Sequence, residues 1–144
     1  MDSSFLKKQH QLMALFAHQS PEAQYEELIR LGRAQPRLDA KFKHPANLVK
    51  GCQSLMYLHC HFEQGRLYFV GESDALISAG LAALLTKVYS GETAETVLKQ
   101  QPDYLDSLSI KANLTPSRAN GLYSIHLRMK QDALKFLVEM RDVT

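Results

Sequence analysis

The chain has 144 residues, 45% of them hydrophobic and 22% charged, with 7 glycines and 5 prolines. This length and composition predict a single globular domain over residues 1–144 and exclude a disordered or fibrous chain. The net charge of +2 is too small for a protein that displaces counterions from nucleic-acid phosphates, so we expect no nucleic-acid partner.

The first predicted element is a helix over residues 5–17, where apolar residues recur at helical spacing. Lys7, Lys8 and His10 interrupt the only apolar run of this segment. The N-terminus therefore predicts neither a signal peptide nor a membrane span, and we expect a soluble protein of the cytoplasm without membrane contact.

A second helix is predicted to follow at once. Ser20 is a typical N-cap, and Pro21 occupies the first helical position, where its missing N–H is harmless. This helix should end between residues 33 and 36. Residues 38–50 are polar and basic with a proline in the middle, which predicts a loop.

After Ser54 the hydrophobic period changes from helix to strand. The apolar residues now occupy every second position, which is typical of a half-buried strand: Met56, Leu58, Cys60 and Phe62. Residues 63–66 predict a turn, and residues 67–70 predict an antiparallel partner strand. Because two strands alone are marginal, we expect a third strand near Leu48 and helices over one face.

The second half of the chain predicts helices. Ser73 or Asp74 can cap a largely apolar helix that runs to residue 88. Short helices should follow over residues 93–100 and 102–109, and a long one should begin at Thr115–Pro116. The order of elements predicts an α+β fold of two layers, with an antiparallel sheet packed against helices.

The two cysteines have different surroundings. Cys60 lies on the apolar face of the predicted strand, where burial disfavours the thiolate and leaves an inert side chain. Cys52 follows Gly51 at a junction between loop and strand, two residues after Lys50. This position suits a reactive thiol, although a cysteine after a glycine is also common in plain cores. Two cysteines do not indicate a disulfide framework.

The sequence gives less support to a metal site, a phosphate-binding loop or a Cys–His hydrolase. His59 and His61 would lie on one face of a strand and Cys60 on the other, so they cannot ligate one metal ion, and we expect no metal site even if His44 or His126 came near. The glycines are too scattered for a phosphate-binding loop. A Cys–His hydrolase would require an imidazole against Cys52, which the sequence does not show.

Residues 114–122 contain a polar helix start followed by Asn120–Gly121, which allows tight packing against a neighbouring loop. The N-terminus of such a helix could stabilise an anionic sulfur if the fold brought it near Cys52.

Four stretches together resemble the SufE family of sulfur acceptors, which includes CsdE-type proteins. They occur in the family's order within about residues 20–127: Leu28-Ile29-Arg30-Leu31-Gly32, Val49-Lys50-Gly51-Cys52-Gln53-Ser54, Gly71-Glu72-Ser73-Asp74-Ala75 with Gly80-Leu81, and residues 114–122. The resemblance implies an α+β fold with a three-stranded antiparallel sheet, akin to IscU-type scaffold proteins.

The resemblance also implies a function. Cys52 would accept persulfide sulfur from a cysteine desulfurase of the SufS or CsdA type, stimulate that enzyme and pass the sulfur to an iron–sulfur scaffold of the SufBCD type. The chain would bind no cofactor, because the pyridoxal phosphate belongs to the desulfurase, and it would not be an enzyme by itself. We expect Cys52 to rest in a shallow apolar pocket and to swing out when the partner docks.

The same resemblance assigns partner-binding or loop-supporting roles to six residues. They are Gly51, Gln53, Ser54, Asp74, Arg118 and Asn120. The alternative function is a non-catalytic adaptor that regulates a desulfurase through surface contacts without handling sulfur.

Overall fold

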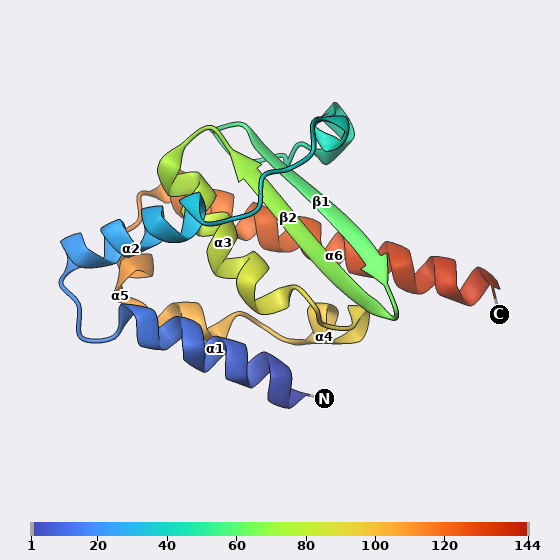
Figure 1. Cartoon of the computed structure of the whole chain (residues 1–144), viewed down its shortest axis with the longest axis horizontal. Helices are drawn as coiled ribbons and strands as arrows, with labels where there is room; N and C mark the ends of the chain where they lie inside the picture. The colour runs from blue at the N-terminus through green and yellow to red at the C-terminus, as the bar shows by residue number, and fades with distance from the viewer. Residues whose placement is uncertain (1, 144) are drawn as a thin grey trace.

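The structure is a computed structural model that describes residues 2–143, with side chains described for residues 4–108, 110 and 112–140. Figure 1 shows a two-stranded ribbon that crosses in front of α6, with α3 beside β2. In chain order the elements are α1 (Asp2–Phe16), α2 (Pro21–Arg33), β1 (Met56–Glu63), β2 (Arg66–Ser73), α3 (Leu76–Tyr89), α4 (Ala94–Lys99), α5 (Ser109–Ala112) and α6 (Pro116–Val143). Three short 3₁₀ turns join them: η1 (Ala40–Phe42), η2 (Pro45–Asn47) and η3 (Asp103–Ser107).

Helix α3 is the centre of the fold, in contact with α1, α2, α6 and β2. Its closest neighbour is α2, and the two helices cross where each has a glycine. A Cβ on Gly32 would lie 2.7 Å from the backbone nitrogen of Gly80, and a Cβ on Gly80 would lie 2.6 Å from Leu28 Cγ. The absence of side chains at both positions is therefore what lets the helices approach so closely.

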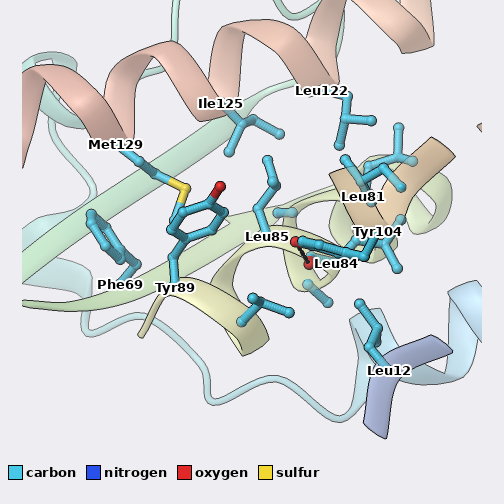
Figure 2. Packing of buried hydrophobic residues seen from close by; sticks show 14 of the residues in the cluster. Leu12, Phe69, Leu81, Leu84, Leu85, Tyr89, Tyr104, Leu122, Ile125 and Met129 are labelled. Atoms are coloured by element: carbon cyan, nitrogen blue, oxygen red, sulfur yellow. Dashed lines mark hydrogen bonds between the residues drawn. The ribbon is translucent and has the colours of Figure 1, made fainter. Parts of the chain in front are cut away.

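One part of the apolar core lies between α3 and the facing side of α6. Figure 2 shows Leu81 and Leu85 of α3 opposite Leu122 and Ile125 of α6. All four are buried. The hydroxyl of Tyr104, also buried, donates to the carbonyl of Leu84 at 2.6 Å and satisfies its polar group inside the core. This packing fixes the positions of α3 and α6, and therefore of the residues at their ends.

The sheet is an antiparallel pair in continuous register from Met56 opposite Ser73 to Glu63 opposite Arg66. The hairpin turn is made by Gln64 and Gly65, with φ of 51° and 79°. In a two-residue hairpin, positive φ at both turn residues matches the natural twist of the two strands. The predicted alternation and turn are thus confirmed, and β2 is longer than the sequence indicated.

The predicted third strand is wrong: the described residues form a sheet of two strands only. Leu48 makes a single antiparallel bridge, to Tyr57, and no ladder. Pro45 starts a 3₁₀ turn immediately before this bridge, and the chain leaves the sheet again after Val49. The segment is therefore too short between its two bends to pair as a strand.

Smaller differences concern helix ends. Neither Ser73 nor Asp74 caps α3, whose N-cap is Ala75; the Ser73 hydroxyl instead accepts a hydrogen bond from the Ala75 N–H at 3.2 Å. The single helix predicted over residues 102–109 is replaced by η3 and the start of α5. Within residues 2–143, the long helices all lack an apolar stretch sufficient to cross a membrane.

Candidate functional site

Cys52 lies near the tip of a loop that is closed at its base. The Val49 N–H donates to the carbonyl of Met56 at 2.8 Å, next to the bridge between Leu48 and Tyr57. The intervening residues leave the sheet and reach the N-terminal ends of α3 and α6. The single bridge found in place of a third strand thus has a clear consequence, because it anchors the loop that carries the thiol.

Gly51 sets the path of this loop against α6. Its φ is +95°, a conformation that L side chains rarely adopt. A Cβ at this position would also collide with the hydroxyl of Ser124 and lie 3.2 Å from Ser124 Cβ. Gly51 is thus required twice, for its backbone angle and for its close approach to α6.

The thiol of Cys52 points at the backbone of α6. Its Sγ lies 3.8 Å from the carbonyl oxygen of Gly121 in a weak S–H···O hydrogen bond. A Cβ on Gly121 would lie 3.6 Å from the sulfur, which is an ordinary van der Waals distance. The loop does pack against Gly121 as predicted, but the contact is not so tight that it requires a glycine.

Burial changes the acidity of Cys52. The residue is half-buried, and desolvation raises the pKa of its thiol above the ordinary value. In this resting position the sulfur is therefore mainly a neutral thiol, which is a poor nucleophile.

A groove of about 570 Å³ opens beside the sulfur. Its apolar walls are formed by Met56, Ile77, Leu81 and Ile125. The residues described along the groove include only one charged side chain, that of Arg118 in the first turn of α6. The groove has room for at least one further atom on Cys52, and any negative charge there would lie near a cation and the N-terminus of α6.

The six supporting residues predicted from the resemblance lie at different distances from this groove. Gln53, Ser54 and Arg118 line it, and Ser54 Oγ lies 3.1 Å from Ser78 Oγ of α3, which ties the loop to that helix. Gly51 packs on α6 as described. Asp74 and Asn120 are both exposed and are not among the residues described along the groove.

Sequence reasoning missed several residues that hold the loop. Ser78 and Ser124 contact it from α3 and α6, and nothing about an isolated serine on a helix signals such a role. Arg128 of α6 was also missed. Its guanidinium donates to Asn47 Oδ1 at 3.1 Å and to the Leu58 carbonyl at 3.4 Å, which joins α6 to the start of the loop and to the edge of β1.

The other thiol and the histidines lie elsewhere. Burial raises the pKa of Cys60 to about 12, so this thiol stays protonated. His59 stacks on the ring of Phe42 at a centroid distance of 3.7 Å. Among the described residues that line the Cys52 groove there is no histidine, and in the described part of the chain no group of three potential ligands could hold a metal ion.

Comparisons with known proteins point to one family. Residues 10–133 match the family model described as SufE, Fe-S metabolism associated domain. The chain is 35% identical over 119 residues to an uncharacterised SufE-like protein of Synechocystis, covering 83% of this chain and 75% of that protein. It is 35% identical over 106 residues to the sulfur acceptor protein CsdE of Escherichia coli, covering 72% of each chain.

The solution structure of a hypothetical protein from Thermus thermophilus superposes with a TM-score of 0.76, over 91% of this chain and 96% of that one. At 24% sequence identity this likeness supports the fold alone.

Proposed function

The chain belongs to the SufE family, and we propose on that basis that it is a sulfur acceptor, which takes sulfur from a cysteine desulfurase and carries it as a persulfide on Cys52. The observation that supports this most directly is a half-buried thiol on a loop, beside a groove with apolar walls and one cation. A sulfur carrier needs these features: a thiol that can become accessible, a shelter for the product and stabilisation of its charge.

The transfer step is an exchange between sulfurs. The Cys52 thiolate attacks the terminal sulfur of a persulfide on the desulfurase, a new S–S bond forms at Cys52, and the S–S bond of the donor breaks. The donor cysteine leaves as a thiolate and takes the proton that Cys52 gave up. Because one S–S bond replaces another, the step needs neither an oxidant nor a reductant.

The raised pKa of Cys52 fits a carrier whose thiol is unreactive until its partner docks. In the groove the thiol is neutral and reacts slowly with small oxidants. When the loop moves outward the desolvation is relieved, the pKa returns toward its ordinary value, and the thiolate fraction rises. Once the sulfur has been taken up, return to the groove shelters the persulfide.

Arg118 and the N-terminus of α6 stabilise the charged forms. A persulfide is more acidic than a thiol, so the loaded protein carries a negative charge at Cys52. Arg118 lines the groove that receives this charge, and the helix dipole has the same favourable sign. Leu55 and Leu76, 51% and 49% exposed, add apolar surface next to the loop for the docked desulfurase.

In this proposal the desulfurase, of the SufS or CsdA type, supplies the pyridoxal phosphate, and the chain binds no cofactor. The protein stimulates the desulfurase by removing sulfur from it, and passes the sulfur to an iron–sulfur scaffold of the SufBCD type in the cytoplasm.

The decisive experiment is labelling by a desulfurase supplied with cysteine. Mass spectrometry should find one added sulfur atom on Cys52, which a reductant removes. The Cys52→Ser variant should gain nothing, whereas Cys60→Ser, the matched control, should be labelled as the wild type is. Labelling at Cys60 would refute the assignment. If Cys52→Ser still stimulated the desulfurase fully, the protein would instead be an adaptor that does not handle sulfur.

A further inference from the structure

A second cavity, of about 320 Å³, lies against a different face of α6. The Cys52 groove uses Gly121 and Ile125 of this helix, whereas the second cavity uses Leu122, His126 and Lys130. Successive residues of a helix point about 100° apart, so the two sets face different directions. Helix α6 is a wall shared by two separate cavities.

The second cavity has an apolar floor. Three leucines from three elements form it, Leu85 of α3, Leu105 of η3 and Leu122 of α6, and none is more than 6% exposed. In Figure 2 Leu85 extends toward α6 and Leu122 extends toward α3. A branched aliphatic group is the natural occupant of such a floor.

Two opposite charges stand at the same cavity without pairing. Asp103 of η3 and Lys130 of α6 both line it, and neither side chain forms an ion pair or hydrogen bond with the rest of the described chain. Asp106 also lines the cavity and already interacts with another part of the protein. A cavity lined by one unpaired carboxylate and one unpaired ammonium group suits a ligand that carries both charges.

His126 lines the same cavity, and one of its ring nitrogens lacks a hydrogen-bond partner among the described residues. The residue is 7% exposed, and its Nε2 has no partner among the described residues. Burial lowers the pKa of His126 to about 4, with a smaller contribution from the charge of Lys130, so the ring is neutral at physiological pH. An unsatisfied buried nitrogen is unfavourable, and a polar ligand group beside the ring would relieve it.

We propose that this cavity binds an α-amino acid with an aliphatic side chain. The ammonium group of the ligand pairs with Asp103, its carboxylate pairs with Lys130, and its side chain packs on the three leucines. A simple anion would be repelled by Asp103 and a simple cation by Lys130, while a purely apolar molecule would leave both charges unpaired. The volume is at the small end of ligand sites, as a single amino acid requires.

The test uses L-leucine as the probe and two analogues that each lack one charge. Titration of the whole protein with L-leucine, followed by amide NMR, should give saturable shifts in residues 101–106 and 122–130, with a dissociation constant of about 1 mM or tighter. N-acetyl-leucine lacks the ammonium group and leucinamide lacks the carboxylate, so each should bind at least about tenfold more weakly.

Variants give an independent readout. Asp103→Asn and Lys130→Gln should each weaken leucine binding about tenfold. As controls, Glu95→Gln and Lys99→Gln each remove one charge of the same sign from α4, where both side chains are 71% exposed. Both variants should bind leucine as the wild type does.

Three results would overturn the proposal: no saturable shifts, equal binding of all three molecules, or shifts confined to the Cys52 groove. None of these results bears on sulfur transfer, because Cys52→Ser leaves this cavity intact and the labelling experiment does not involve it.

Discussion

Replacement of Gly51 by alanine tests whether the backbone of the loop decides where Cys52 lies. The φ of +95° at Gly51 is unfavourable for alanine by about 1–2 kcal/mol, and the new Cβ would also collide with Ser124. Gly65 provides the matched control. Its φ is +79°, and a Cβ there would meet nothing within 4 Å. The two variants therefore share the backbone strain and differ in the contact with α6.

We expect Gly65→Ala to lower the free energy of unfolding by about 1 kcal/mol and Gly51→Ala to lower it by about 2 kcal/mol. Only Gly51→Ala should displace the thiol from the Gly121 carbonyl, because only that glycine lies between the loop and α6. A displacement of this kind can slow a reaction strongly, and we expect sulfur uptake by Gly51→Ala to slow at least about tenfold. Uptake by Gly65→Ala should be unchanged.

Urea unfolding gives the stabilities, and the rate of labelling by a desulfurase gives the sulfur uptake. Adding Ser124→Ala to Gly51→Ala should recover part of the lost stability, since the hydroxyl is removed while the Cβ contact at 3.2 Å and the strained φ remain. The reasoning would be refuted if Gly51→Ala and Gly65→Ala were equally stable and took up sulfur at the same rate.

Three further predictions concern stability and charge. Gly80→Ala should lower the free energy of unfolding by about 3 kcal/mol in urea titrations, because the new Cβ would lie 2.6 Å from Leu28 Cγ. A loss below about 1 kcal/mol would contradict the close crossing of α2 and α3. The pKa of His126 is lowered from 6.5 to about 4, so its contribution to stability is complete above pH 6.5 and falls by about 3 kcal/mol as the pH drops to 4. The unfolding free energy of His126→Gln should lack this pH dependence, and an equal dependence in both proteins would refute the prediction. Arg118→Gln should slow sulfur uptake about threefold at low salt and less at high salt, whereas a salt-independent defect would argue against an electrostatic role.

Much of the architecture follows from local patterns. The alternation from Met56 onward predicted β1, and Ser20–Pro21 predicted the start of α2, where the Ser20 hydroxyl indeed accepts from the Ala23 N–H at 3.2 Å. These signals are readable because strand and helix periodicity, and capping by a side chain, involve residues only a few positions apart.

The errors arise where distant contacts override local preference. Because two strands alone are marginal, a third strand is expected near Leu48, yet Leu48 forms only a single bridge before the loop leaves the sheet. Ser73 is a good N-cap by type, but its hydroxyl binds the Ala75 N–H, and α3 starts two residues later than a Ser73 cap would give, without a side-chain cap. In both cases the route of the chain between β1, β2 and α3 decides the outcome.

For the function, the sequence by itself singled out Cys52 through its place between Gly51 and Gln53 and through the resemblance of four stretches to one family. Only the tertiary structure decided that this sulfur is half-buried, has a raised pKa and lies beside a groove with Arg118. The physical reason is separation along the chain. The carbonyl that the thiol contacts belongs to a residue 69 positions later, and burial by so distant a segment leaves no local trace in the sequence.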